Sequence, residues 1–243
     1  MKKITYIFSK GRINKLNNKN YSDDFFYGYR YLQNMELDLS VIEFNDINKI
    51  LKRIEYYISK LSSLPLYVFS LLSKKNIKKL KDTDNLVLIS ESTGFAVLPL
   101  LICLKKRFNI STHMFVMGLY SKKINFAALK WLHLFLIKLL FNYIDKLYFL
   151  GIEEYNIAKK IHKKNEKLIF LPFHVDNNFW KGESLDLEKN IPILFIGNDS
   201  NRDYRLLIDL AKKMPNNKFI FVTSNIQVLN INLENVELIK GDW

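Results

Sequence analysis

Cysteine is almost absent from this chain of 243 residues, and its scarcity excludes a disulfide-stabilised fold. Cys103 is the only cysteine, so no internal disulfide can form, which suits a reducing cytoplasm. Glycine and proline are scarce too, with eight and five residues. So few chain-breaking residues argue against a disordered or fibrous protein. No group of His, Cys and Asp has the spacing of metal ligands, so we expect no metal site.

Long apolar runs are also missing. No stretch of about eighteen uncharged apolar residues occurs, so we expect no membrane-spanning helix. The basic start MKKITYIFSKGR has the opening of a signal peptide, but its apolar stretch, Ile4 to Phe8, is too short and no small-residue cleavage site follows. We expect a first β-strand there, in a cytoplasmic protein that can also attach peripherally to the inner face of the membrane.

Positive charge is what the sequence has in excess. Lysine and arginine number 37 against 24 acidic residues, which gives a formal net charge of +13. This excess favours partners that carry negative charge, such as phosphates, nucleic acid or an anionic membrane. Alternatively, the lysines only solvate helices. We expect no nucleic acid as partner, because the chain has no helix-turn-helix, zinc or aromatic stacking signature.

Short apolar segments alternate with longer helical patterns, and nearly half of the residues are apolar. The expected strands are 3–8, 37–44, 85–91, 110–118, 145–151, 167–173, 191–197, 218–224 and 236–239. The expected helices are 21–35, 47–64, a second helix in the segment from there to Leu80, 92–107, 125–144, 153–164 and 202–214. Apolar strands joined by helices predict an α/β fold with a parallel sheet covered on both faces. Such sheets bind ligands at the carboxyl ends of their strands.

The segment LPFHVDNNFW, residues 171–180, joins two expected strands, and ILFIGNDSNRDYRLLIDLAKKMPNNKFIFVT follows it at 193–223. Together they resemble the interdomain joint and the first donor-domain elements of the GT-B glycosyltransferases of family four, the retaining group-one enzymes. The resemblance implies a GT-B-like fold. A Rossmann-like acceptor-side domain would cover 1–178, and an incomplete Rossmann-like donor-binding domain would start at 179–243.

In this resemblance Pro172, His174 and Asp176 belong to the interdomain joint. The implied activity moves a sugar from a nucleoside-diphosphate-sugar to a glycan or lipid-linked acceptor in cell-surface polysaccharide synthesis. It needs no metal or other cofactor. The family's pair of glutamates separated by seven residues does not occur after Trp180. The alternative is therefore a non-catalytic protein of the same fold that binds acceptor or membrane.

The loop GNDSNRD is the candidate donor-phosphate site. Gly197 lets the backbone approach a diphosphate, Asn198 can donate hydrogen bonds, and Arg202 can grip a phosphate from the start of the next helix. The family usually has arginine directly after the loop glycine, where this chain has Asn198. The alternative is a capped turn in which Arg202 pairs with a neighbouring aspartate.

Candidate residues of the acceptor side follow the first and third expected strands. Gly11 and Arg12 occupy the first loop, which is alternatively a solvated basic turn. Glu91 is a candidate base and Ser92 a candidate ligand of a sugar hydroxyl, although this segment also reads as a helix cap. The resemblance adds His113 as a catalytic candidate. Its place inside the expected strand also allows a structural role.

The helix expected at 125–144 is apolar on one side and basic elsewhere, with a tryptophan beside the lysines. Such a helix can lie in an anionic membrane interface. Its membrane-facing residues would be Lys122, Lys123, Lys130, Trp131 and Lys138. The alternative is a crossover helix whose apolar side is core.

Overall fold

The computed structural model describes residues 2–120, 124, 126–162, 165–181, 191–198, 202–225, 228 and 230–241. These residues form two compact units, Met1–Lys181 and Gly182–Trp243. Each unit has its own parallel sheet and its own hydrophobic core. The α/β fold class that the sequence predicts is thereby confirmed.

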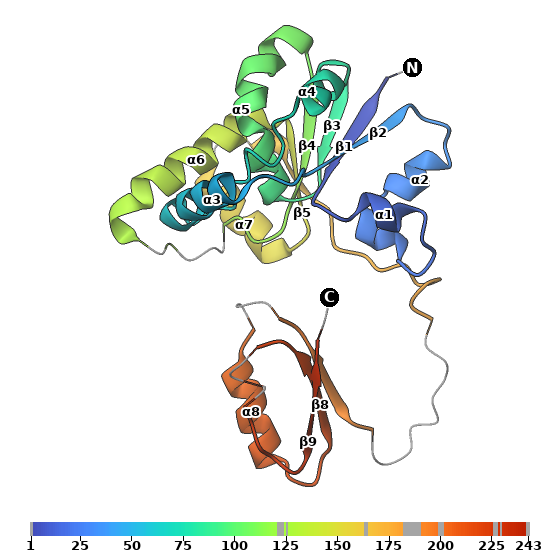
Figure 1. The fold of residues 1–243 in the computed structure, drawn as a ribbon, viewed down its shortest axis with the longest axis vertical. Coiled ribbons are helices and arrows are strands. Elements are labelled where there is room, and N and C mark those ends of the chain that lie inside the picture. Colours follow the sequence, from blue (N-terminus) through green and yellow to red (C-terminus); the bar gives the residue numbers. More distant parts are fainter. Residues whose placement is uncertain are drawn as a thin grey trace. The chain divides into compact units, whose positions relative to one another are not determined.

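A six-stranded parallel sheet forms the centre of the first unit (Figure 1), in the order β2-β1-β3-β4-β5-β6. Every neighbouring pair of strands is parallel. The strands are β1 (Ile4–Phe8), β2 (Leu39–Glu43), β3 (Asn85–Leu88), β4 (Ser111–Val116), β5 (Lys146–Phe149) and β6 (Leu168–Phe170). Burial alternates along β3, β4 and β5, so successive side chains point to opposite faces.

One face of this sheet carries the larger core. Fully buried side chains such as Ile7, Leu88 and Phe149 pack there against four helices. These helices are α4 (Lys74–Lys81), α5 (Glu91–Phe108), α6 (Lys130–Tyr143) and α7 (Ile152–Ile161), and α3 (Lys49–Ser62) packs on α6. Figure 1 shows them on one side of the sheet, away from α1 and α2.

The other face has a smaller aromatic core under α1 (Ile13–Leu16), the 3-10 helix η1 (Asp23–Phe26) and α2 (Tyr29–Gln33). The sequence predicts one helix over 21–35, and this prediction is wrong. Tyr27 and Gly28 interrupt it with φ angles of 52° and 79°. Left-handed backbone ends a right-handed helix, and glycine adopts it without steric cost.

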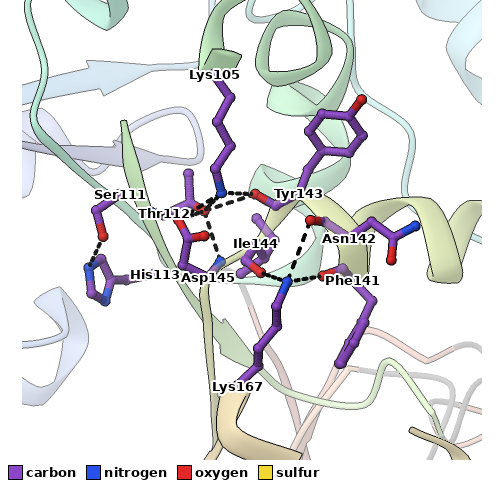
Figure 2. A network of polar contacts seen from close by, with 10 residues as sticks. All are labelled: Lys105, Ser111, Thr112, His113, Phe141, Asn142, Tyr143, Ile144, Asp145 and Lys167. Carbon is purple, nitrogen blue, oxygen red and sulfur yellow. Dashed lines mark hydrogen bonds and ion pairs between the residues drawn. The ribbon is translucent and has the colours of Figure 1, made fainter. Parts of the chain in front are cut away.

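Two lysines stabilise the amino-terminal ends of β4 and β5 (Figure 2). The Lys105 Nζ atom lies 2.7 Å from Asp145 Oδ2 and donates to the Tyr143 carbonyl at 2.6 Å. The Lys167 Nζ atom donates to the carbonyls of Phe141 and Ile144 at the carboxyl end of α6, where a cation is favoured. This polar network lies at the end of the strands opposite the one that binds ligands in such folds.

The second unit has a three-stranded parallel sheet of β7 (Ile193–Ile196), β8 (Phe219–Thr223) and β9 (Val236–Lys240). Helix α8 (Tyr204–Lys213) packs on it through Tyr204 and Ala211. Strand, loop and helix follow each other as the sequence predicts. The loop from β7 to α8 therefore leaves the carboxyl end of a parallel strand.

Candidate functional site

The strand order of the first unit creates a crevice between β1 and β3. The chain leaves β1 toward β2 on one side, and the remaining strands lie on the other side of β1. Ligands of open α/β sheets bind at such a switch point, outside the carboxyl ends of the strands. Here the loop with Gly11 and Arg12 follows β1, and the first turn of α5 with Glu91 and Ser92 follows β3. The topology thus brings the two predicted acceptor-side segments to the same crevice.

Arg12 lies against an aromatic ring rather than in a solvated turn. Gly11 has a φ of 88°, which turns the chain back toward η1. The Arg12 guanidinium lies 3.5 Å from the centroid of the Phe25 ring and donates a hydrogen bond to the Phe25 carbonyl. Burial lowers the pKa of Arg12, and the nearby Tyr27 opposes this shift. The cation is therefore held in place at the crevice.

Tyr27 is a residue of this site that the sequence analysis missed. Its backbone is left-handed, and its carbonyl accepts a hydrogen bond from the Tyr6 hydroxyl at 3.2 Å. Burial raises the pKa of Tyr27 most, Arg12 lowers it, and the carboxylates of Glu91 and Asp24 raise it further. The available signal was the Tyr-Gly pair inside an otherwise helical pattern.

Glu91 is the first residue of α5 and is only 7% exposed. A carboxylate is favoured at this end of a helix because the backbone N–H groups there are positive. The Ser92 hydroxyl lies 2.7 Å from that of Ser90, and the Ser90 N–H donates to the Thr93 hydroxyl at 3.2 Å. The cap of α5 thus begins at Ser90, one residue before Glu91. Tyr27 connects the two predicted acceptor-side segments, because the charges of Arg12 and Glu91 both shift its pKa.

His113 lies inside β4, opposite Val87 of β3 and Lys146 of β5. Its Nδ1 atom is 3.1 Å from the Tyr148 hydroxyl and its Nε2 atom is 3.2 Å from the Ser111 hydroxyl, the contact drawn in Figure 2. Burial lowers the pKa of His113 and favours the neutral ring. The structure does not place His113 beside Glu91, which follows the carboxyl end of β3.

The predicted joint continues from β6 along the carboxyl ends of neighbouring strands. The Phe173 N–H donates to the Leu150 carbonyl at 3.3 Å, and Pro172 is exposed. The Asp176 Oδ1 atom accepts from the N–H groups of Asn178 and Phe179 and so closes a turn. His174 and Asp176 line a cavity of about 410 Å³ within the first unit.

In the second unit, the predicted phosphate-binding residues Gly197 and Asn198 directly follow β7, and Arg202 lies just before α8. A Cβ atom on residue 197 would overlap the Arg202 side chain, so glycine allows the arginine to lie there. The Asn198 Oδ1 atom accepts from the Thr223 hydroxyl at 3.2 Å. Asp203 caps α8, because its Oδ1 atom accepts from the Leu206 N–H at 2.9 Å. The structure thus brings Gly197, Asn198 and Arg202 together in one loop.

The predicted membrane-facing residues divide into two groups. Lys122 and Lys123 lie outside the described residues. Lys130, Trp131 and Lys138 are exposed on α6, with Trp131 65% exposed. The core side of α6 is formed by Ile137, Leu140 and Phe141 together with His133, whose Nδ1 atom lies 2.8 Å from the Ser62 carbonyl.

Two negative findings apply to the part of the chain that the structure describes. It contains no helix with the length and apolar character needed to cross a membrane. It also contains no cluster of His, Cys, Asp and Glu that could hold a metal ion.

No family model matches the sequence, and no curated protein matches it. Solved structures do resemble its fold. The S. aureus MnaA–UDP structure matches with a TM-score of 0.53 and 13% identity, over 99% of this chain and 69% of that one. The UDP-GlcNAc 2-epimerase of Neisseria meningitidis bound to UDP-GlcNAc matches with 0.52 and 14%, over 99% and 72%. A putative UDP-N-acetylglucosamine 2-epimerase of Listeria monocytogenes matches with 0.53 and 9%, over 98% and 69%. The likeness supports a GT-B-like fold.

Proposed function

We propose that the protein is a retaining glycosyltransferase that moves a sugar from a nucleoside-diphosphate-sugar to a glycan or lipid-linked acceptor in cell-surface polysaccharide synthesis. The observation that carries this proposal is the loop from β7 to α8. There Arg202 packs on Gly197 at the amino-terminal end of a ten-residue helix. The helix end and the guanidinium both attract a diphosphate.

The proposed chemistry uses this positive charge on the leaving group. When the sugar leaves, negative charge grows on the departing diphosphate, and a fixed guanidinium stabilises that charge more in the transition state than in the substrate. On the acceptor side, Glu91 is the proposed base or acceptor ligand, and its charge and that of Arg12 both shift the pKa of Tyr27. No metal is needed for this division of roles.

Two solved neighbours support the donor class, because one is a complex with UDP and the other is bound to UDP-GlcNAc. They also favour a second candidate, a nucleotide-sugar epimerase. Both activities begin with binding of the same kind of donor. They differ in the product, since a transferase passes the sugar to an acceptor and an epimerase inverts one of its carbons.

A panel of UDP- and GDP-sugars with glycan acceptors tests these activities. Nuclear magnetic resonance distinguishes a transferred sugar with retained anomeric configuration from an epimerised donor. Absence of turnover with measurable acceptor binding would favour the non-catalytic alternative. Absence of binding to UDP and GDP by calorimetry would contradict the donor proposal.

The proposed location is the anionic inner face of the membrane, and α3 supports it together with α6. One side of α3 is an exposed apolar stripe of Ile50, Ile54, Tyr57, Ile58 and Leu61, each at least 40% exposed. The cations Lys49, Lys52, Arg53 and Lys60 of the same helix are also exposed. An amphipathic helix with an uncovered apolar side and a basic side is typical of interfacial binding.

Helix α6 packs beside α3 and adds further apolar groups. Trp131, Leu134 and Phe135 are each more than half exposed, and Lys130 and Lys138 are exposed next to them. We propose that the two helices together bind the membrane, with apolar side chains in the interface and lysines on anionic headgroups.

A further inference from the structure

The first unit contains two adjoining cavities whose charged lining residues are acidic, although the protein as a whole is basic. Their volumes are about 410 and 340 Å³, and Asp24, Tyr27 and Phe173 line both. The larger cavity lies at Phe115 of β4 and at Leu150 and Leu171, which follow β5 and β6. It therefore occupies the ligand-binding edge of the sheet, and its volume is in the range of small-molecule sites, about 300–1,000 Å³.

Aromatic rings form a large part of the walls. Tyr27, Tyr31, Phe115 and Phe173 line the larger cavity, and Trp180 lines the smaller one. Three of these rings remain largely in water, with exposed fractions of 65% for Tyr31, 58% for Phe173 and 61% for Trp180. Exposed apolar groups gathered around a hollow mark a place where a ligand is bound.

The charged groups in the lining are acidic. Among the residues described as lining either cavity, none is lysine or arginine, although the chain has a net charge of +13. Cations outside the lining contact lining residues, among them Lys15, whose Nζ atom lies 4.8 Å from the centroid of the Tyr21 ring. Arg30 forms an ion pair with Asp23 at 3.0 Å, and Arg12 stacks on Phe25. Asp24 and Asp176 therefore determine the sign of the charge inside.

This combination of rings and carboxylates matches the chemistry of a sugar. The C–H face of a pyranose packs on an aromatic ring, and its hydroxyl groups donate hydrogen bonds to carboxylate oxygens. An ammonium group on the sugar would gain attraction from both the rings and the acids. A phosphate or a uronic acid would instead meet like charge.

We propose that these joined cavities bind a neutral or amine-bearing saccharide and discriminate against an anionic one. That this saccharide is the end of the acceptor to which the sugar is transferred rests on the proposed function. The binding itself does not require a donor.

The walls are held in place before a ligand arrives. The Tyr27 ring lies 5.1 Å from the Phe115 ring, and its hydroxyl donates to Met117 Sδ at 3.4 Å. The Trp180 Nε1 atom donates to Asp24 Oδ2 at 3.4 Å, which connects a ring of the smaller cavity to the shared carboxylate. Rings fixed in this way lose little conformational entropy on binding.

Calorimetric titration of the full chain without nucleotide tests the proposal. The probes are oligomers of N-acetylglucosamine, their amine-bearing deacetylated counterparts and oligomers of galacturonic acid. We expect binding of the first two, and weaker binding of the third.

Phe173→Ala and Tyr31→Ala should each lower the affinity by about three- to tenfold, the range of one aromatic contact. Asp24→Asn should reduce the preference for the amine-bearing oligomer. Tyr56→Ala, which removes an equally exposed ring on α3, should change nothing.

Two results would overturn the proposal: tighter binding of the acidic oligomer, or no binding of any oligomer by a chain that binds UDP. The second result would leave the donor part of the proposed function intact. Conversely, saccharide binding that depends on Phe173 and Tyr31 in a chain that binds no nucleotide would support the cavity and contradict the transferase.

Discussion

Arg202 lies so close to Gly197 that a Cβ atom at residue 197 would overlap the Nε, Cδ and Cζ atoms of the arginine. The same glycine accepts a hydrogen bond through its carbonyl from the Tyr204 hydroxyl at 3.3 Å. The position of the guanidinium thus depends on a residue without a side chain. A phosphate site built on this arginine should be sensitive to a methyl group five residues away.

The first prediction follows from this contact. Arg202→Ala should weaken binding of UDP or GDP by about ten- to a hundredfold, since a hydrogen bond to a charged group is worth roughly 1.5–3 kcal/mol. Gly197→Ala should also weaken nucleotide binding, because the added methyl group displaces the Arg202 guanidinium. Arg202→Lys should recover only part, because the fork of two parallel N–H groups is lost. Calorimetry measures all three variants.

Arg205→Ala is the matched control, since it removes an exposed arginine of the same helix outside the loop. It should bind nucleotide as the unchanged protein does. Equal affinity of the unchanged protein and Arg202→Ala would mean that the loop serves only as a helix cap.

The strands and most helices could be predicted from the sequence, because each is a short apolar run or an amphipathic pattern with its own period. The unbroken helix at 21–35 was the exception. Its apolar pattern continues through Tyr27, but Gly28 permits a left-handed turn, and the aromatic core under β1 selects it. That turn places Tyr27 in the crevice, and the Tyr-Gly pair is the signal for it in the sequence.

Apart from His174 and Asp176 of the predicted joint, the cavity residues could not be predicted, for a different reason. Asp24, Phe115 and Phe173 come from three separate segments, and each has an ordinary role when read alone. Only the strand order brings them to one edge. Similarly, α3 has the amphipathic pattern of a core helix, and only its measured exposure reveals that its apolar stripe is uncovered.

The second prediction concerns Glu91. Glu91→Gln keeps the shape of the side chain but removes its charge and its ability to accept a proton. A positioned base contributes about a hundred- to ten-thousandfold to a reaction rate, so sugar transfer should fall within that range while nucleotide affinity stays unchanged. Turnover and calorimetry on the same preparation check this. Unchanged turnover would restrict Glu91 to a structural role in the first turn of α5.

The third prediction is a pH dependence of stability. Burial alone would raise the pKa of Asp145, but the hydrogen bonds from Lys105 and Thr112 outweigh it and hold this pKa below its ordinary value. A carboxylate with a lowered pKa in the folded state stabilises the protein above its unfolded pKa of about 3.9, and this contribution is lost as the pH falls through the folded pKa.

Asp145→Asn should therefore lower the free energy of unfolding at pH 7, and the difference from the unchanged protein should narrow below about pH 4. Lys105→Met should lower the free energy of unfolding by about 1 kcal/mol at pH 7. This value allows for the partial exposure of the Lys105–Asp145 pair. Urea unfolding at several pH values measures both. Lys10→Met breaks the exposed Lys10–Asp46 pair and should leave stability almost unchanged. If the free energy of unfolding of Asp145→Asn differed from that of the unchanged protein by the same amount at every pH, the lowered pKa of Asp145 would be contradicted.

The fourth prediction separates the two sources of membrane affinity. Replacing Lys130 and Lys138 by Glu should weaken binding to anionic vesicles by about 1 kcal/mol or more per site, and added salt should produce a similar loss in the unchanged protein.

Replacing Ile50, Ile54 and Leu61 by Asn should weaken the same binding by about 1 kcal/mol per side chain, but this loss should persist at high salt because it arises from apolar burial. Vesicle sedimentation at two salt concentrations distinguishes the two effects. Tyr67→Asn is the matched control, an exposed ring that lies outside both helices. If the isoleucine and leucine variants sediment as the unchanged protein does, α3 does not enter the interface, and the lysines of α6 alone account for the attraction.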